Sequence, residues 1–335
     1  MKILLYVLFL GVIQINFSQT MIQIPLENDA SHPSFLIENL QSKSSDTFTE
    51  FIQGPISINA DENNSFYILD QIGNKILPYD EDGIPRKPIN LDSYENTAKY
   101  IDLAIIKKQQ LIVYNEQNQR FSLISLNKTP SETLSPSLPQ TLFGSPFIIN
   151  RFELTANKST LIIQNEFDGH IYTTPLAELF SQQSIKLRKV KNSNTTGVTT
   201  NFHKKLGFLA WTANDPAKHK VQFSHLDSTR QLKDWFSTST FDQFSGVTPL
   251  SLHDNDFVFA LFQGTESSLK LNQIRIASIS KETVEETSIP FVSNQLPWYT
   301  SRRICSNGSK VYVMSYHKKL RSLNIDIISI NQKTK

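Results

Sequence analysis

The residues best suited to bind a small molecule lie far apart in this chain of 335 residues. A carboxylate such as Asp102 pairs with a cationic amine, whereas an arginine such as Arg302 or Arg303 pairs with an anion. Aromatic rings supply apolar walls and attract cations through their faces. The predicted ligand-binding residues are Tyr100, Asp102, Asn150, Phe244, Trp298 and Arg302. They act together only if the fold brings the segments that carry them to one axis.

Sequence signatures of the common catalytic and metal-binding classes do not occur. The chain contains no HExxH, EF-hand, GxSxG, P-loop or paired CxxC pattern, and its seven histidines are scattered. One carboxylate beside an arginine makes a poor site for a divalent cation, because hard cations require several oxygen donors. The sequence therefore predicts no metal and no cofactor, and it leaves any catalytic residue unassigned.

A sixfold repeat supplies the elements that position these residues. Each unit contains an apolar run followed by a polar turn, and the runs begin at residues 66, 111, 161, 206, 257 and 311. Their starts are separated by 45, 50, 45, 51 and 54 residues, as successive subtraction shows. Repeats of this length with several strands each are typical of propeller blades. The sequence thus predicts an all-β fold, a six-bladed β-propeller.

Each unit is expected to contain four strands, of which the second is apolar on both sides. In the first unit the predicted strands are residues 55–59, 65–69, 75–79 and 87–91. A middle strand loses its alternation because neighbouring blades cover both of its faces. The ends of the six inner strands converge on the axis, and such positions favour ligand binding.

The two ends of the repeat are incomplete in a complementary way. The sixth unit stops near Ile330 after three strands, whereas strand-like runs at residues 21–26 and 35–37 belong to no unit. We expect one of these runs to pair with the last blade and close the ring, because an open seam would expose unpaired strand edges.

Residues 129–139 are expected to form a surface loop, and residues 176–180 one helical turn after Pro175.

The first 18 residues have the pattern of a secretory signal peptide. Lys2 precedes an apolar run at residues 3–13 that is too short to span a bilayer, and a small residue, Ser18, offers a cleavage point. The expected organisation is a signal peptide at residues 1–18 and a single propeller domain at residues 19–335. The predicted location is secreted, either extracellular or periplasmic, with no membrane span in the mature chain.

Charge and cysteine content narrow the expected partners. Lys and Arg total 33 against 31 for Asp and Glu, a net charge of +2, which argues against nucleic acid. Cys305 is the single cysteine, so the chain has no internal disulfide. Its apolar–polar context favours a small buried side chain over a reactive thiol.

Several segments resemble the major royal jelly and yellow protein family. Residues 169–179 are similar to the strand and short helix of that family, residues 294–299 with 308–315 to its closing blade, and residues 66–70 with 77–80 to its first blade. Two features depart from the family pattern. Trp298 is followed by Tyr299 and Thr300 where the family has Trp-Pro-Asp, and the usual cysteines are missing. The resemblance therefore implies a divergent member; NHL-type and gluconolactonase-like propellers remain competing families.

The resemblance implies binding of a small amine or catechol-like molecule at the central channel, with Asp102 as the anchor for an amine. Three alternatives stay open. In the first, Asp102 binds no ligand and accepts hydrogen bonds only from neighbouring backbone amides. In the second, the protein is an enzyme, either a propeller hydrolase of lactones or esters or a yellow-type isomerase, and in the third it is an extracellular scaffold for protein interactions. The sequence does not choose the ligand, the source or the oligomeric state.

Overall fold

The computed structural model describes most of the repeat region. The described residues are 19–25, 38–44, 47–91, 99–107, 110–126, 131–142, 144–149, 151–155, 158–181, 185–190, 197–199, 209–214, 220–226, 232–239, 244–253, 256–263, 270–279, 284–290, 300–317 and 319–330. For some of them, including 38–44 and 47–53, it gives the backbone alone.

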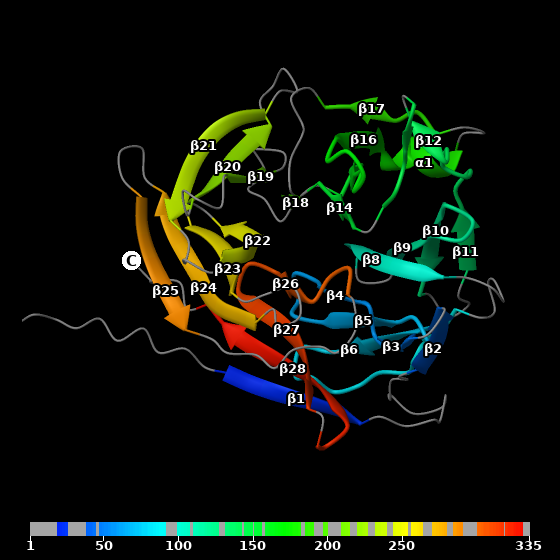
Figure 1. Cartoon of the computed structure of the whole chain (residues 1–335), viewed down its shortest axis with the longest axis horizontal. Coiled ribbons are helices and arrows are strands. Elements are labelled where there is room, and N and C mark those ends of the chain that lie inside the picture. Colours follow the sequence, from blue (N-terminus) through cyan, green and yellow to red (C-terminus); the bar gives the residue numbers. More distant parts are fainter. Residues whose placement is uncertain are drawn as a thin grey trace, which may run out of the picture.

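Six four-stranded antiparallel sheets surround one axis, and we number these blades along the chain (Figure 1). Blade 1 contains β4 (Ser57–Ala60), β5 (Phe66–Asp70), β6 (Lys75–Tyr79) and β7 (Ile89–Asn90). Blade 2 contains β8 (Tyr100–Lys107), β9 (Gln110–Asn115), β10 (Arg120–Ser125) and β11 (Ser131–Leu134). Blade 3 contains β14 (Phe152–Leu154), β15 (Thr160–Gln164), β16 (Ile171–Pro175) and β17 (Arg188–Lys189).

Blades 4 and 5 continue the same order along the chain, and blade 6 includes a strand from near the start. Blade 4 contains β18 (Gly197–Thr199), β19 (Leu209–Asn214), β20 (Lys220–Leu226) and β21 (Leu232–Ser239). Blade 5 contains β22 (Phe244–His253), β23 (Asp256–Gln263), β24 (Lys270–Ile279) and β25 (Val284–Pro290). Blade 6 contains β26 (Ile304–Ser306), β27 (Lys310–His317), β28 (Ser322–Ser329) and β1 (Gln19–Pro25). The six-bladed prediction is confirmed.

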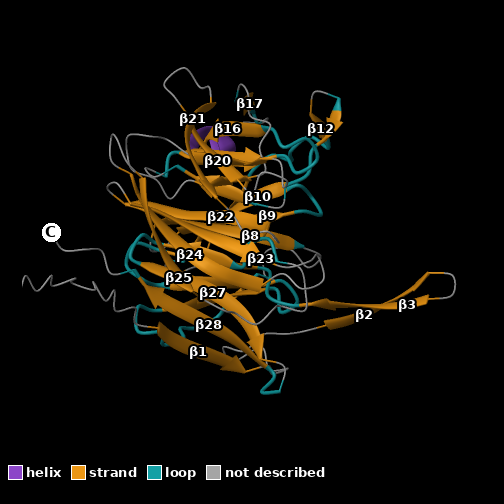
Figure 2. Cartoon of the chain, turned by 60° about the vertical axis from the view of Figure 1, so that its left-hand side comes forward, coloured by secondary structure: helices purple, strands orange, loops and turns teal. Residues whose placement is uncertain are grey.

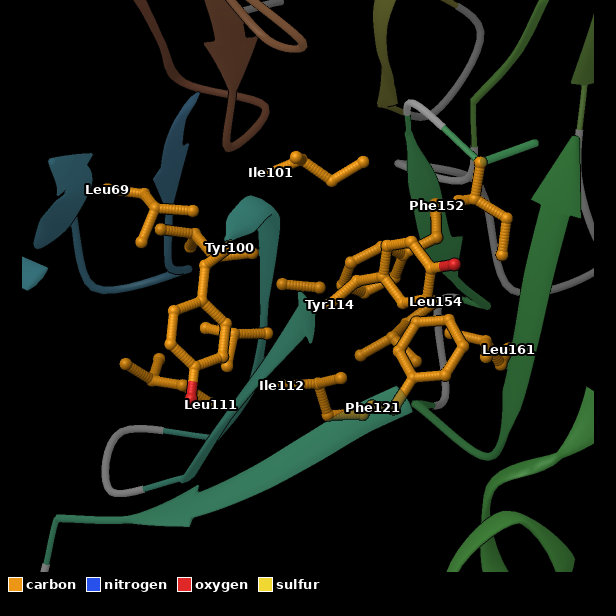
Figure 3. Close-up of a cluster of buried hydrophobic side chains, with 14 of the residues drawn as sticks. Leu69, Tyr100, Ile101, Leu111, Ile112, Tyr114, Phe121, Phe152, Leu154 and Leu161 are labelled. Atoms are coloured by element: carbon orange, nitrogen blue, oxygen red, sulfur yellow. The ribbon is translucent and has the colours of Figure 1, made fainter. Parts of the chain in front are cut away.

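The second strand of blade 1, β5, is apolar up to its last residue because its two faces pack on different blades. Every residue of β5 is buried. Phe66 and Ile68 belong to the hydrophobic cluster shared with blade 6, whereas Tyr67 and Leu69 belong to the cluster shared with blades 2 and 3. Alternate residues of one strand therefore join two cores, which Figure 3 shows for the side of Leu69.

The N-terminal strand β1 occupies the outer position of blade 6. It pairs antiparallel with β28 from Gln19↔Ile328 to Pro25↔Ser322. Only Ile24 of this strand is fully buried. Ile22 packs on the same cluster and approaches Gly83, a left-handed residue (φ 76°) in the turn after β6, so closely that a Cβ on Gly83 would meet its side chain. Strand β1 thus touches both the last blade and the first.

The remaining elements lie outside the blades. The helix α1 (Leu176–Ser181) follows β16, as predicted for residues 176–180. A hairpin of β2 (Glu38–Ser44) and β3 (Thr47–Gln53) projects away from the ring (Figure 2), and a short one joins β12 (Thr141–Leu142) to β13 (Ser145–Pro146). Neither hairpin was predicted.

One local prediction needs correction, and another is tested only in part. Residues 131–134, expected in a surface loop, form the outer strand β11, because they pair with β10 through backbone groups that composition does not reveal. The fourth apolar run, expected from residue 206, contributes the strand β19 from Leu209 onward, and residues 206–208 lie outside the described part of the chain. Among the described residues, no helix is long and apolar enough to cross a membrane.

Candidate functional site

Charged side chains from three blades meet at one end of the ring axis. Every inner strand begins at the same end, because each blade repeats the same strand order. Asp102 lies near the start of β8, Glu153 lies in β14 with Arg151 just before it, and Arg302 lies two residues before β26. We call these four residues the axial charge network.

Arg302 is the centre of the axial charge network. Its Nη2 donates to Asp102 Oδ2 at 3.0 Å and its Nε donates to Asp102 Oδ1 at 3.3 Å. Nη1 donates to Glu153 Oε1 at 2.5 Å, and Nη2 also donates to the carbonyl of Phe152 at 2.7 Å. With its side chain only 2% exposed, this guanidinium connects blades 2, 3 and 6.

Backbone pairing fixes the position of Arg302. The residue forms a parallel bridge with Ser57 of blade 1. The Ile58 amide donates to the Arg302 carbonyl at 3.0 Å, and the Arg302 amide donates to the Ile56 carbonyl at 3.3 Å. Ser301 Oγ adds bonds to the carbonyls of Ile101 at 2.5 Å and Ile56 at 3.2 Å. The segment that enters blade 6 is therefore held against blades 1 and 2.

Asp102 uses both oxygens on partners within the protein. Ser57 Oγ donates to Oδ1 at 2.6 Å, and the Phe152 amide donates to Oδ2 at 3.1 Å, besides the two bonds from Arg302. The side chain is completely buried. The backbone amide that donates to Asp102 is that of Phe152 on the next blade, not a neighbouring one as the alternative predicted, and its main partner is a buried arginine. An amine ligand would have to displace Arg302 to reach it.

Arg151 is the one arginine of the axial charge network that stays partly accessible. Its Nε and Nη2 donate to the same atom, Glu153 Oε1, at 3.0 and 2.7 Å. Its side chain is 20% exposed, and within the described residues Nη1 has no hydrogen-bond partner. A guanidinium offers five N–H donors, so Arg151 retains donors for a further acceptor.

The pKa shifts within the axial charge network follow from these contacts. Burial by itself would lower the pKa of Arg302, but Asp102 and Glu153 raise it above its ordinary value. Burial would raise the pKa of Glu153, but Arg302 and Arg151 lower it. For Arg151, burial and then repulsion from Arg302 outweigh Glu153 and Asp102, so its pKa is lowered. Of the two arginines of the axial charge network, Arg151 is thus the one whose charge is less compensated.

Buried Asx residues position the loops at this end of the ring. The second strands of blades 1, 2 and 3 lead to Asp70, Asn115 and Asn165, whose Oδ1 atoms accept backbone amides of the following turns. In blades 2 and 3 the same oxygen also accepts an amide of the segment that leads into the inner strand, from Lys99 at 3.3 Å and from Ile148 at 3.0 Å. In blades 2 and 3 the polar residue that ends the apolar run therefore joins two loops.

The structure describes only some of the six predicted ligand-binding residues, and it places these in different environments. Asp102 and Arg302 meet, but as partners of one another. Tyr100 is 1% exposed and its ring lies in the hydrophobic cluster near Leu69 and Leu111, so it packs between blades (Figure 3). Phe244 begins β22 with its backbone alone described, and Asn150 and Trp298 lie outside the described residues.

Sequence reasoning missed three contributors, Ser57, Arg151 and Glu153. For two of them the signal was a charged pair, Arg151 and Glu153, two residues apart and shortly before the third apolar run at residue 161. Arg303, the other arginine considered for an anion, has a different partner: its Nε donates to the Met314 carbonyl at 3.0 Å. Cys305 is buried as predicted, and burial raises the pKa of its thiol to about 12. In the part of the chain that the structure describes, no three His, Cys, Asp or Glu side chains group as metal ligands.

The fold and the axial charge network define a β-propeller whose inner strands carry paired charges. Residues 49–230, just over half of the chain, match the family model DUF5128, described as 6-bladed beta-propeller. The chain belongs to this family. No curated protein is significantly similar to it in sequence.

Solved structures agree with the fold. A selenomethionine-substituted virginiamycin B lyase from Staphylococcus aureus has 12% identity and a TM-score of 0.51, with 94% of this chain and 100% of that chain covered. The beta-propeller domain of Cps50 (Swd1) from Myceliophteria thermophila has 10% identity and a TM-score of 0.51, with 83% and 84% covered. A Bacteroides thetaiotaomicron protein of unknown function has 12% identity and a TM-score of 0.50, with 94% and 77% covered. At these identities the likeness concerns the fold alone, and none of the comparisons points to the major royal jelly or yellow family.

Proposed function

We propose that this protein binds a small anionic molecule at the end of the ring axis where Arg151 lies. The observation that carries the proposal is the incomplete pairing of Arg151: both of its hydrogen bonds go to one oxygen of Glu153, and its side chain keeps 20% exposure. A partly desolvated guanidinium with spare donors binds carboxylate, sulfonate or phosphate groups through charge-assisted hydrogen bonds.

An anion fits this arrangement better than the amine that the sequence suggested. Asp102 is enclosed by Ser57, Phe152 and Arg302, so its negative charge is already neutralised. Glu153 is likewise engaged by Arg151 and Arg302. Of the two arginines of the axial charge network, Arg151 is the one with spare donors, and burial and repulsion from Arg302 lower its pKa despite Glu153.

Calorimetric titration of the purified protein tests the proposal. The probes are inorganic phosphate and hexane-1-sulfonate against hexylammonium and catechol. We expect saturable binding of the anions and at least a tenfold weaker affinity in Arg151→Gln, about 1.4 kcal/mol. Arg188→Gln is the matched control, because Arg188 is on the outer strand of the same blade in an exposed pair with Glu178. Tighter binding of hexylammonium or catechol, or an unaffected Arg151→Gln, would overturn the proposal.

The other expectations are also proposals. A secreted location is supported by the N-terminal sequence, and β1 begins at Gln19, the residue after the expected cleavage point. A mature protein whose first residue is Gln19, shown by mass spectrometry, would agree with it. The resemblance to major royal jelly and yellow proteins stays a prediction, since the matched model describes six-bladed propellers in general. Stoichiometric Ca²⁺ or Zn²⁺ in the purified protein would favour the hydrolase alternative instead.

A further inference from the structure

Two large apolar side chains are exposed at the same end of the ring, on blade 3. Phe167 is 61% exposed and Ile148 is 41% exposed. Phe167 lies in the turn after β15, and β15 is antiparallel to β14, so this turn is beside the start of the inner strand. Ile148 lies in the segment that leads into β14, three residues before Arg151. Three residues span at most about 11 Å between Cα atoms, so the apolar pair and the arginine are neighbours.

The backbone holds this apolar pair rigidly. The amides of Ile148 and Phe167 donate to the same oxygen, Asn165 Oδ1, at 3.0 and 3.3 Å. The Glu166 amide donates to the Ile148 carbonyl at 2.9 Å, and Asn165 Nδ2 donates to the Pro146 carbonyl at 2.9 Å. Asn165 itself is completely buried. Exposed apolar groups held on such a scaffold bind a partner with little further loss of conformational entropy.

From this juxtaposition we propose that the ligand is an amphipathic anion, with its charged group on Arg151 and its apolar part against Phe167 and Ile148. The inference rests on the proposed function and adds the chemical class of the ligand. Charge complementarity selects the head group, and contact with the two side chains selects the tail. A fully buried methylene improves affinity about fourfold, so a tail of several carbons gives a clear preference even when it is only partly covered.

The experiment compares methanesulfonate with hexane-1-sulfonate, which carry the same charge at every working pH, by NMR titration of the purified protein. We expect hexane-1-sulfonate to bind at least tenfold more tightly. Phe167→Ser should reduce that ratio to below threefold. Leu320→Ser is the matched control, because Leu320 is 60% exposed in the turn after β27, at the same end of the ring on blade 6, and the ratio should persist there.

Each result has a separate meaning. Equal affinities of the two sulfonates in the unmodified protein, or an undiminished ratio in Phe167→Ser, would overturn the amphipathic ligand and leave anion binding intact. A ratio lost equally in Leu320→Ser would also overturn it. If neither sulfonate nor inorganic phosphate binds, the proposed function fails, and this inference fails with it.

Discussion

Replacing Arg302 with methionine removes the cation shared by two buried carboxylates. The side chains of Arg302, Asp102 and Glu153 are 2%, 0% and 6% exposed, so solvent does not substitute for the lost guanidinium. Asp102 keeps Ser57 and the Phe152 amide, and Glu153 keeps Arg151. Removing one partner of a buried ion pair costs about 3–5 kcal/mol. At roughly 2 °C per kcal/mol for a large domain, we expect Tm to fall by about 6–10 °C.

The assay is thermal and urea-induced unfolding followed by circular dichroism. Arg188→Met is the control, since its partner Glu178 is 3.6 Å away in an exposed pair that contributes less than about 1 kcal/mol. Adding Asp102→Asn to Arg302→Met should recover part of the loss, because the amide carries no charge that needs neutralising. Equal, small shifts for Arg302→Met and Arg188→Met would show that the axial charge network does not stabilise the ring.

Further perturbations test other parts of the molecule. Deleting residues 1–25 should lower Tm by several degrees, because it uncovers the edge of the last blade; an unchanged Tm would refute the role of β1 in closing the ring. Gly83→Ala should cost about 1 kcal/mol or more in urea unfolding, because the left-handed turn disfavours a side chain and Ile22 occupies the space. Arg302 and Arg151 depress the pKa of Glu153, so Glu153 binds fewer protons in the folded protein than in the unfolded chain. The stabilisation that Glu153 contributes is therefore present above about pH 4.3 and is lost on acidification. Glu153→Gln should flatten this part of the curve of unfolding free energy against pH. Burial and the neighbouring Glu116 raise the pKa of Glu166 above its ordinary value. Hexane-1-sulfonate should therefore bind more tightly as acidification protonates Glu166, and Glu166→Gln should abolish that dependence.

Much of the ring could be predicted from local patterns. The apolar run at β5 reads as a strand buried on both faces, and the structure divides its residues between two inter-blade clusters as that pattern requires. The missed strands show the limit. Strand β11 and the hairpin of β2 and β3 depend on backbone pairing between polar segments, and polar composition does not distinguish such segments from loops.

The site was less accessible to sequence reasoning. Choosing Asp102 and Arg302 as axial residues required only the position of each near an inner strand. Their pairing with one another, and the choice of Arg151 as the accessible cation, depend on the side-chain directions of several blades at once. Glu153 is the one charged residue of a three-residue strand, and a strand this short has too little alternation to show which face Glu153 occupies.

The amino-acid sequence by itself determined the repeat, the strand order within a blade and the apolar faces between blades, because these follow from the spacing and polarity of neighbouring residues. Only the tertiary structure decided which charges neutralise each other. Closing the ring brings Arg302 within hydrogen-bond distance of a carboxylate 200 residues earlier in the chain. Electrostatic partners are selected by distance in space, and the arginine left with spare donors could be recognised only after the other groups had met.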